Sequence, residues 1–336
     1  MKRRAIIKGI LLGAPLWMIS RSGHTQDEKQ QEKQKAGPAL LEGDTAAHDP
    51  STIVREGGSY WMFHTGRGGP SKFSSDLKNW QSGLPVFPQI PAWWKEIAPE
   101  NPGDWWAPDI IKLGDRWAIF YSVSSFGKNT SAIGLTTNQT LNSFSTDYAW
   151  RDEGIVVQSR ATDNFNAIDA ALTFDHENRL WMSFGSFWSG IKLIELNAKT
   201  GQRLNQEMFS IAAPPPGSPA IEAPCIYRRG KDYFLFVNWG FCCRGMESTY
   251  EVRIGRSQKV TGPYLDKDGR DLMQGGGSLF LTRRGRFIGP GHIGVLEDKG
   301  ALWCSYHFYD EANNGRPTLM IEKLKFDKDG WPLLAT

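Results

Sequence analysis

Residues 107–124 read APDIIKLGDRWAIFYSVS and contain the pattern from which the fold can be predicted. An apolar run follows the Ala-Pro-Asp break, Gly114-Asp115 supplies a tight turn, and a second run carries Trp, Phe and Tyr. Two runs rich in β-branched and aromatic residues, joined by a Gly-Asp turn, predict a β-hairpin.

The same pattern occurs in four further places. Each copy has a break containing Pro, Asp, Glu or Gly, then an apolar run, a polar turn and an aromatic strand. The copies are DPSTIVREGGSYWMFHT at 49–65, DAALTFDHENRLWMSFGSF at 169–187, EAPCIYRRGKDYFLFVNWG at 222–240 and GHIGVLEDKGALWCSYHFY at 291–309. Their matching aromatics recur about every sixty residues, which fits a four-stranded blade with long connections. We therefore predict an all-β fold, a single five-bladed β-propeller over residues 41–336; a β-sandwich does not explain this repeat.

The composition suits such a fold. The chain has 336 residues, of which 40% are hydrophobic, and this is enough for a large core. Its 39 basic and 36 acidic residues are interspersed, so we expect no nucleic-acid partner. The 14 Trp and 36 Gly are typical of an aromatic-rich β protein that binds flat, amphipathic ligands such as sugars.

The N-terminus has a different character. Residues 1–20, MKRRAIIKGILLGAPLWMIS, combine a basic start with an apolar run too short to span a bilayer. We expect an export signal over residues 1–25; KRRAIIK at 2–8 resembles the twin-arginine type, with ordinary secretion and an uncleaved membrane anchor as alternatives. Residues 26–40 predict a polar linker. The mature protein should be periplasmic or secreted, without stable membrane association.

The chain has four cysteines, Cys225, Cys242, Cys243 and Cys304. No Cys-x-x-Cys pair occurs, which argues against a zinc site. A bridge between the adjacent Cys242 and Cys243 needs a strained ring, and pairing with Cys225 is an alternative that the sequence does not decide. We expect these residues to be structural or free rather than catalytic.

Three of the five units open with an acid, namely Asp49, Asp169 and Glu222. Because the inner strands of a propeller line its channel, these acids should meet at one end of it. Crowded and partly desolvated carboxylates repel one another, which separates their pKa values. One such acid alone more often caps a turn or pairs with Arg. Three at matched positions favour glycoside hydrolysis, in which one carboxyl protonates the leaving oxygen while another activates water or attacks the anomeric carbon.

Seven short motifs support this interpretation through their order and spacing. They are HDPS at 48–51, WAPD at 106–109, SSFGKNTSAIGL at 124–135, NAID at 166–169, GSFWSGI at 185–191, IEAP at 221–224 and GPGHIGV at 289–295. Together, over about residues 45–330, the chain resembles the arabinanases of glycoside hydrolase family 43.

The resemblance implies a five-bladed propeller that cuts the α-1,5-linked arabinofuranose chains of arabinan with inversion, by endo action. Asp49 takes the general-base position, Glu222 the general-acid position, and Asp169 the place of the carboxylate that raises the pKa of the acid and orients it. For inversion we expect the carboxyl groups of Asp49 and Glu222 to lie roughly 6.5–9.5 Å apart. Ala170 stands where many relatives have Pro, which puts only local backbone rigidity in doubt.

His292 opens the fifth unit. The resemblance implies that it helps to hold a metal ion, usually calcium, through ordered waters; the alternative is a histidine satisfied by backbone hydrogen bonds. Calcium normally takes six to eight oxygen ligands, and no dense acidic loop supplies them. We therefore expect a structural calcium ion that is largely coordinated by water.

Sugar rings pack their apolar faces on aromatic side chains. The residues expected to bind substrate are Trp105, Trp106, Phe126, Gly127, Asn166, Ser186, Phe187 and Trp188. Trp105 and Phe126 are the strongest candidates, although each aromatic could instead belong to the core of a blade. Trp93 and Trp94, in an insert, either extend the groove or fasten the insert. For residues 241–245, FCCRG, we expect only a tight loop near Glu222.

Two other functions fit the same scaffold. An exo-acting α-L-arabinofuranosidase or a β-xylosidase would use the same acids, and loop lengths would decide whether the groove is blocked. A non-catalytic propeller would bind glycans or proteins without turnover. In each case we expect a monomer.

Overall fold

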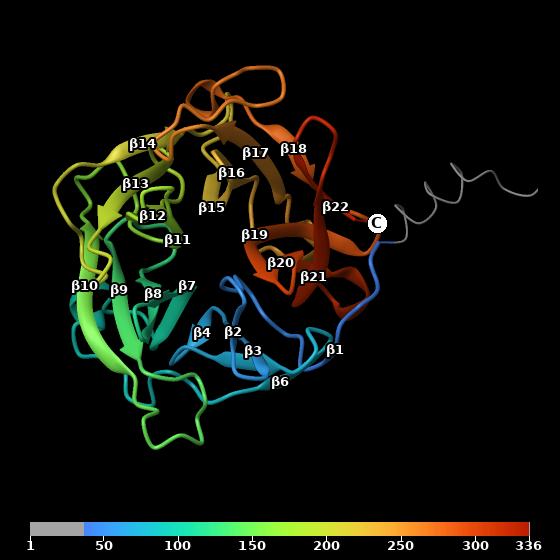
Figure 1. Cartoon of the computed structure of the whole chain (residues 1–336). Helices are drawn as coiled ribbons and strands as arrows, with labels where there is room; N and C mark the ends of the chain where they lie inside the picture. Colours follow the sequence, from blue (N-terminus) through green and yellow to red (C-terminus); the bar gives the residue numbers. More distant parts are fainter. Residues whose placement is uncertain (1–36, 336) are drawn as a thin grey trace, which may run out of the picture.

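The computed structural model describes residues 37–335, which form five β-sheets around a central axis (Figure 1). This confirms the predicted all-β propeller with five blades and excludes the β-sandwich. The expected export signal and most of the expected linker lie outside the described residues. Within residues 37–335, no helix has the length and apolar character needed to cross a membrane.

Neighbouring strands within a blade are antiparallel, except for one parallel strand at the outer edge of blade 1. Blade 1 has the order β1-β6-β5-β3-β2 and contains β1 (Glu42–Gly43), β2 (Val54–Glu56), β3 (Ser59–Phe63), β5 (Ser71–Ser74) and β6 (Asn79–Ser82). Blade 2 has the order β10-β9-β8-β7-β4 and contains β4 (Gly66–Arg67), β7 (Asp104–Leu113), β8 (Arg116–Val123), β9 (Ser131–Asn138) and β10 (Arg151–Ser159).

The other three blades have four strands each, in chain order. Blade 3 contains β11 (Ala171–Phe174), β12 (Leu180–Phe184), β13 (Ile191–Leu196) and β14 (Phe209–Ala212). Blade 4 contains β15 (Ile221–Arg229), β16 (Asp232–Trp239), β17 (Glu251–Ser257) and β18 (Ser278–Leu281). Blade 5 contains β19 (Phe287–Asp298), β20 (Ala301–Asp310), β21 (Arg316–Phe326) and β22 (Pro332–Leu334). The described helices are short: α2 (Trp94–Ile97), η1 (Gly245–Glu247), η2 (Leu272–Gln274) and η3 (Glu311–Asn313).

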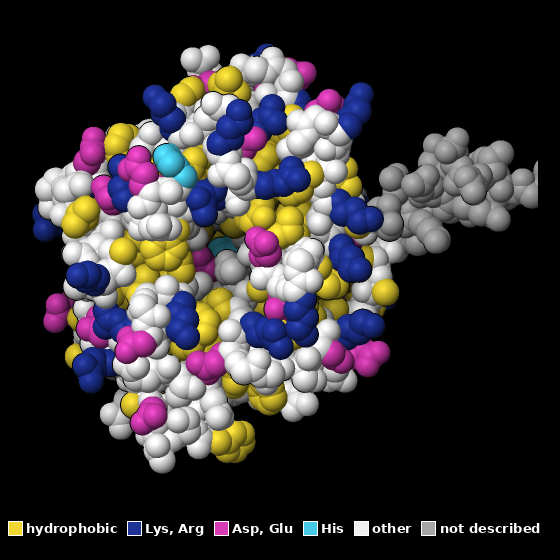
Figure 2. All heavy atoms as spheres, viewed as in Figure 1, with side chains coloured by type: hydrophobic (Ala, Val, Ile, Leu, Met, Phe, Trp, Pro, Cys, Tyr) yellow, Lys and Arg dark blue, Asp and Glu magenta, His cyan; other side chains and the backbone are white. Residues whose placement is uncertain are grey.

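The five predicted hairpins are confirmed, and each supplies two neighbouring strands in the inner part of its blade; in blade 2 the short strand β4 lies beyond them. Gly57 and Gly58 join β2 to β3, and Gly230 with Lys231 joins β15 to β16. Figure 2 shows one face of the ring, where Lys and Arg side chains are spread among Asp and Glu side chains around a central hollow. The charges on this face therefore form no single basic patch.

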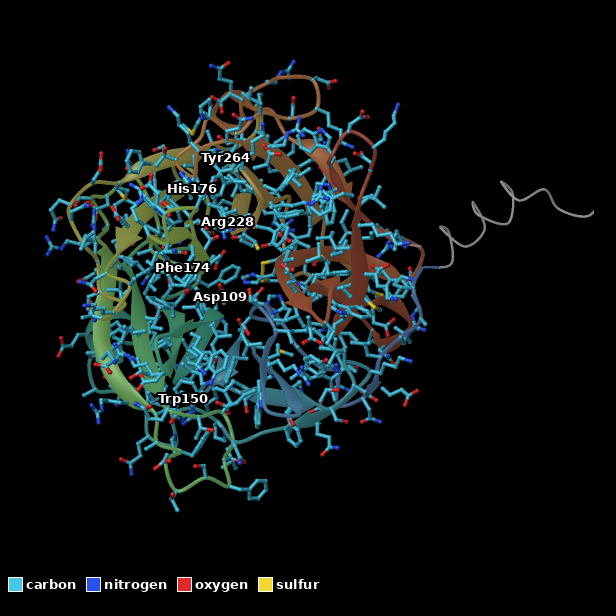
Figure 3. All side chains as sticks on the ribbon, viewed as in Figure 1. Asp109, Trp150, Phe174, His176, Arg228 and Tyr264 are labelled. Atoms are coloured by element: carbon cyan, nitrogen blue, oxygen red, sulfur yellow. A yellow bond between two sulfur atoms is a disulfide. The ribbon has the colours of Figure 1, made fainter. Side chains whose placement is uncertain are left out.

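The blades hold together through apolar contacts between neighbours. A cluster of buried apolar side chains fills each junction from blade 1 to blade 5 and the junction that closes the ring. Because packing lies between sheets, removal of water from these faces stabilises the whole ring. Asp109, beside the axis in Figure 3, adds a polar link, since its carboxylate accepts the N–H groups of Thr52 in blade 1 and Leu172 in blade 3.

The N-terminal segment closes the ring. Strand β1 pairs with β6 of blade 1, while Ala46 forms a bridge to Thr318 in β21 of blade 5. The Leu319 N–H donates to the Thr45 carbonyl, and the Ala47 N–H donates to the Pro317 carbonyl. Residues 42–47 thus fasten the first blade to the last.

The five inner strands share a backbone irregularity near their starts. Asp49, Ala107, Asp169, Ala223 and His292 all have positive φ, between 42° and 61°. In blades 2, 4 and 5 the pairing register slips by one residue here, which is a β-bulge. Few residues other than glycine adopt this conformation, and bulges re-aim neighbouring side chains. Five such turns of the backbone direct the strand starts towards one end of the channel.

A ring of hydrogen bonds fixes these five turns, because each N–H donates to a side chain of the preceding blade. The pairs are Asp49 to His307, Ala107 to Thr65, Asp169 to Ser122, Ala223 to Asp169 and His292 to Asn238. Four of the acceptors, His307, Thr65, Ser122 and Asn238, lie on the second strand of a hairpin or just beyond it. In blade 3 the matching residue is Gly185, which has no side chain, so the carboxylate of Asp169 accepts the Ala223 N–H instead.

Candidate active site

One cavity of about 910 Å³ lies where the inner strands begin. Its wall contains Asp49, Asp169 and Glu222, which come from blades 1, 3 and 4. The structure therefore brings the three predicted acids together. Asp169 and Glu222 are buried, with 8% and 7% of their surfaces exposed.

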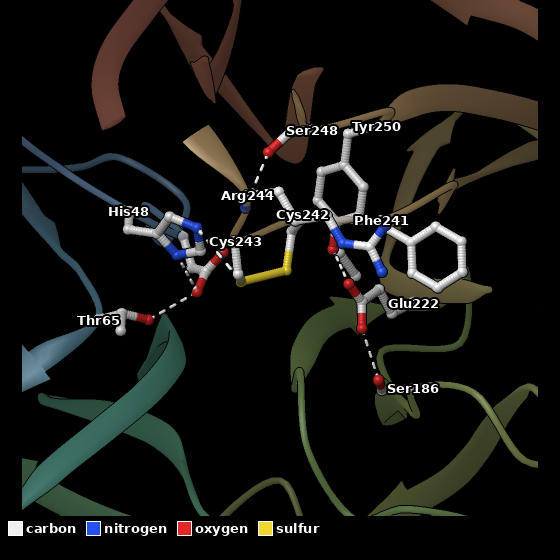
Figure 4. Close-up of a disulfide and its surroundings, with 12 residues drawn as sticks. His48, Thr65, Ser186, Glu222, Phe241, Cys242, Cys243, Arg244, Ser248 and Tyr250 are labelled. Carbon is white, nitrogen blue, oxygen red and sulfur yellow. Dashed lines mark hydrogen bonds and ion pairs between the residues drawn. A yellow bond between two sulfur atoms is a disulfide. The ribbon is translucent and has the colours of Figure 1, made fainter. Parts of the chain in front are cut away.

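Two side-chain donors hold the carboxylate of Asp49, and two further imidazoles lie close to it. Its Oδ2 accepts the Thr65 hydroxyl and the Nδ1–H of His48, both at 2.7 Å (Figure 4 labels these two partners). The Nδ1 atoms of His292 and His307 lie 3.5 and 3.7 Å from its Oδ1. This carboxylate is therefore held in one orientation at the cavity wall.

His48 keeps Asp49 ionised. Burial acts to raise the pKa of Asp49, but the charge and hydrogen bond of His48 hold it well below its usual value. Burial lowers the pKa of both His292 and His307, so His48 is the main cation beside this carboxylate. The pKa of His48 is raised, because the charge and hydrogen bond of Asp49 outweigh burial. An ionised carboxylate with free lone pairs can accept a proton from water.

Glu222 is held by two hydroxyl groups. Its Oε2 accepts the Ser186 hydroxyl at 2.5 Å, and its Oε1 accepts the Tyr250 hydroxyl (Figure 4). The Oδ2 atom of Asp169 accepts the N–H of Ala223, the residue that follows Glu222, at 3.1 Å. Asp169 thereby fixes the backbone that carries Glu222.

Asp169 and Glu222 have the opposite electrostatic character to Asp49. Burial raises the pKa of Asp169 well above its usual value, and the negative charges of Glu222 and Asp49 add to this. Burial also raises the pKa of Glu222, against the hydrogen bonds from Ser186 and Tyr250. Because two neighbouring carboxylates repel each other, the pair keeps a proton at a pH at which an exposed carboxyl has lost it.

Most of the residues expected to bind substrate line this cavity. They are Trp106, Phe126, Gly127, Asn166, Ser186, Phe187 and Trp188. Phe126 is 82% exposed and Trp188 is 40% exposed, so both rings are free to contact a ligand. Asn166 accepts the Ser131 hydroxyl, which fixes its amide, while the hydroxyl hydrogen of Ser186 is already given to Glu222.

The prediction for Trp105 was wrong. Its side chain is fully buried, and its indole N–H donates to the His64 carbonyl. Trp105 pairs with Gly66 in the sheet of blade 2, and alternation along the strand sends its ring into the core while Trp106 faces the cavity. Trp94 is buried and the Trp93 indole donates to Asp152, so both fasten the insert and neither lines the cavity.

Several cavity residues were missed by sequence reasoning. His48 directly precedes Asp49 in the HDPS motif, and Thr65 ends the first hairpin, so both positions offered a signal. Tyr250 lies beyond a loop and had none. Lys128 and Arg244 add positive charge to the cavity wall, and the Arg244 guanidinium stacks on the Phe241 ring.

His292 lies behind the cavity wall, with 8% of its surface exposed. Its N–H donates to Asn238, and its Nδ1 faces Asp49. The described side chains around it offer imidazole nitrogens and one carboxylate rather than the six to eight oxygens that calcium prefers. This donor set fits a calcium ion only in the form expected, with water as the main ligand.

The cysteine pairing is now resolved for the described residues. Cys242 and Cys243 form a disulfide between neighbours, and both line the cavity (Figure 4). Cys225 and Cys304 are buried free thiols. The alternative pairing with Cys225 is therefore excluded, and residues 241–245 form a loop close to Glu222, as expected.

Comparison with known proteins agrees with this geometry. The chain is 45% identical over 296 residues to the extracellular exo-α-(1→5)-L-arabinofuranosidase ArbA of Cellvibrio japonicus, which covers 85% of each chain. It is 40% identical over 289 residues to the extracellular endo-α-(1→5)-L-arabinanase 1 of Bacillus subtilis, which covers 85% of this chain and 86% of that one. The solved structure of Cellvibrio cellulosa α-L-arabinanase complexed with arabinohexaose has a TM-score of 0.83 and 43% identity, covering 86% of this chain and 95% of that chain.

The family model described as glycosyl hydrolases family 43 matches residues 43–332, and so covers all five blades. The resemblance drawn from the seven motifs is thereby confirmed. The chain belongs to glycosyl hydrolases family 43 and is a glycoside hydrolase.

Proposed function

We propose that this enzyme cleaves the α-1,5 linkages of arabinan by endo action, with inversion at the anomeric carbon. The observation that carries the proposal is the electrostatic contrast within one cavity. Asp49 is held ionised, while the Asp169–Glu222 pair retains a proton. Inverting hydrolysis requires one carboxylate base and one protonated acid. The names of the relatives in Cellvibrio and Bacillus support arabinan as the substrate.

Asp49 acts as the general base. His48 and Thr65 hold its Oδ2, which fixes the carboxylate while lone pairs remain on it to take a proton from an attacking water. The water attacks the anomeric carbon, and its proton passes to Asp49 as the new C–O bond forms. His48 stabilises the ionised carboxylate before this transfer.

Glu222 acts as the general acid. Ser186 and Tyr250 hold its two oxygens, so the carboxyl group has one orientation towards the leaving oxygen. It gives its proton to that oxygen as the glycosidic bond breaks and becomes an anion next to Asp169. Exchange of protons with water then returns the proton from Asp49 to the acid side.

Asp169 raises the pKa of Glu222 and positions it. The hydrogen bond from the Ala223 N–H to Asp169 fixes the backbone beside the acid. Because both groups are buried in the same wall, two negative charges at once are disfavoured, and the Asp169–Glu222 pair keeps one proton. A buried acid is thereby kept protonated at a pH suited to catalysis.

Endo action requires sugar contacts on both sides of the acids. Aromatic rings enter the cavity wall from three blades: Trp106 and Phe126 from blade 2, Phe187 and Trp188 from blade 3, and Phe241 from blade 4. Rings distributed in this way support binding of a chain that continues past the cleavage point. The name of the Cellvibrio japonicus relative favours exo action as the second candidate.

Product analysis on debranched arabinan distinguishes endo action from exo action. A ladder of oligosaccharides supports endo cutting, whereas one small product from the start supports exo cutting. The anomeric configuration of the first product, followed by NMR, tests inversion; a retained configuration overturns the assignment of Asp49 as a base. The variant Glu222→Gln should have almost no turnover.

A calcium ion with most of its water shell, held at His292, belongs to the same proposal. When bound, it would supply positive charge against the crowded carboxylates. His292 and Asp49 are the side chains that would face it. Removal with a chelator should lower the melting temperature of the protein, and added calcium should restore it; an unchanged melting temperature contradicts the proposal.

We place the enzyme outside the cytoplasm, since both relatives are named extracellular. In this proposal residues 1–25 are an export signal that is removed, residues 26–40 are a linker, and the mature propeller is a monomer. N-terminal sequencing of the exported protein and light scattering would test these three points.

A further inference from the structure

The loop of residues 241–245 contains a feature that the hydrolytic mechanism does not use. Cys242 and Cys243 are joined to each other, and Cys243 has a positive φ of 64°. The loop is tied at both ends, because the Phe241 N–H donates to the Thr249 hydroxyl and the Arg244 N–H to the Ser248 hydroxyl (Figure 4 shows the second bond). Its middle lies against the cavity.

From this loop a chain of hydrogen bonds runs to Asp49. The Cys243 N–H donates to the Tyr309 hydroxyl oxygen at 2.7 Å. The Tyr309 hydroxyl lies 2.7 Å from Nε2 of His48, whose Nδ1 lies 2.7 Å from Oδ2 of Asp49. The Sγ atom of Cys243 also lies 3.9 Å from the same Nε2.

Partners on both sides hold the ring of His48. An ionised Asp49 only accepts, so Nδ1 of His48 carries a hydrogen and donates it to Oδ2. On the other side, the Tyr309 oxygen accepts the Cys243 N–H and lies within hydrogen-bond distance of Nε2. Both ring nitrogens are therefore engaged, and the chain fixes the orientation of His48.

Tyr309 is well placed to transmit this constraint. It is buried in β20 with 2% of its surface exposed, and it is not part of the cavity wall. Gly289 makes room for its ring: a Cβ added there would lie 3.2 Å from Tyr309 and 2.9 Å from Ser248. Tyr309 therefore has little freedom to turn, and it cannot contact a sugar in the cavity.

We propose that Tyr309 and the Cys242–Cys243 disulfide form a positioning unit for the general base. The disulfide limits the backbone of the loop so that the Cys243 N–H stays on Tyr309; Tyr309 then holds His48, and His48 holds Asp49. This inference rests on the proposed role of Asp49. It assigns positioning roles, outside the reacting atoms, to residues in blade 5 and in the loop after β16.

The first test is Tyr309→Phe, which removes the hydroxyl and keeps the ring. With debranched arabinan, kcat should fall about tenfold or more while KM stays within about twofold, because misplacing a reacting group by an ångström costs up to about 10²-fold in rate. Tyr60→Phe is the matched control: its hydroxyl donates to Asp298, which is outside the cavity wall, and kcat should not change. An unchanged kcat in Tyr309→Phe, with Tyr60→Phe also unchanged, overturns the proposal.

The second test concerns the disulfide. Dithiothreitol reduces Cys242–Cys243 to two thiols and is itself oxidised to its cyclic disulfide, so two electrons and two protons pass to the protein. Reduction should lower kcat several-fold in the unmodified enzyme. Cys242→Ser should show the lowered kcat already and should not respond to reductant; because it retains Cys225 and Cys304, this would assign the effect to the pair.

The combination of the two changes is the sharpest test. If the disulfide acts through Tyr309, reduction of Tyr309→Phe should lower kcat little further, because residues in one network are not additive. Full additivity of the two losses overturns the link between them. Failure of the proposed function looks different, since the unmodified enzyme would then release no sugar from arabinan at all.

Discussion

Asp49 and Asp169 occupy the same position in two blades and have opposite electrostatic character. Both follow a hairpin break, both have positive φ, and both face one cavity. Asp49 is next to three imidazoles, and its pKa is lowered. Asp169 is next to Glu222, and its pKa is raised well above the usual value.

The difference originates in the residues around each acid rather than in the backbone. In blade 1 the N–H of Asp49 donates to His307, and the neighbouring residue is His48. In blade 3 the residue before Asp169 is Ile168. Gly185 stands where the other blades have the side chain that accepts an N–H from the next blade, so the carboxylate of Asp169 accepts the Ala223 N–H instead. One repeated backbone turn thus produces a base in one blade and a partner of the acid in another.

The largest expected effect comes from removing the ionised member. Asp49→Asn keeps the shape of the side chain, and Asn tolerates positive φ about as well as Asp does. Because no base remains to take the proton of water, kcat should fall about 10²- to 10⁴-fold. Steady-state kinetics on debranched arabinan measures this fall. An azide ion that restores turnover would support loss of a base, whereas kcat within about threefold of the unmodified enzyme would exclude Asp49 from that role.

Asp169→Asn should have a smaller effect with a distinct pH signature. The amide oxygen can still accept the Ala223 N–H, so the change mainly removes the second carboxyl group, with which Glu222 shares one proton. Without a second carboxylate to repel, Glu222 loses its proton at lower pH, so the basic limb of the kcat/KM profile should move to lower pH. At the optimum kcat should fall about 10- to 100-fold. A basic limb at the same pH in both proteins would show that Asp169 does not set the pKa of the acid.

Much of this contrast could be predicted from the sequence. Repetition of the hairpin pattern predicted the blades, and matched acids at the starts of the repeats predicted the shared cavity, because both depend on periodicity along the chain. The family resemblance supplied the division of roles. The prediction for Trp105 failed because Trp105 and Trp106 are adjacent on one strand. Alternation along the strand sends one ring to the core and the other to the cavity, and the sequence does not fix which.

Other parts were out of reach because they depend on contacts between distant segments. Tyr250 bonds to Glu222 from 28 residues away, and Tyr309 bonds to His48 across 261 residues. Neither hydroxyl belongs to a local pattern. The disulfide between Cys242 and Cys243 also depends on how one loop is held, which residue spacing alone does not reveal.

The comparison also predicts a stability difference. A carboxyl group whose pKa is raised in the folded protein stays protonated there at a pH at which it ionises in the unfolded protein. The free energy of unfolding therefore falls as pH rises above 3.8, the ordinary pKa of this Asp. Asp169→Asn carries no such cost. Its melting temperature should equal or slightly exceed that of the unmodified enzyme near pH 4 and exceed it by a few degrees at pH 8. Calorimetry at both pH values measures this, and a variant that is less stable at pH 8 would contradict burial of an uncompensated charge.

The smallest expected effect concerns the sugar contacts around the two acids. Phe126 is 82% exposed and lines the cavity, whereas Phe144 is 95% exposed and lies outside its wall. Phe126→Ala should raise KM about threefold to tenfold, since stacking on an aromatic ring contributes roughly 1 kcal/mol. Phe144→Ala should leave KM unchanged, and neither variant should lose stability, because neither ring is packed in a core. Equal KM values for the two variants would remove Phe126 from the binding surface. The contrast between Asp49 and Asp169 would remain, because the hydrogen bonds that orient these two acids do not involve Phe126.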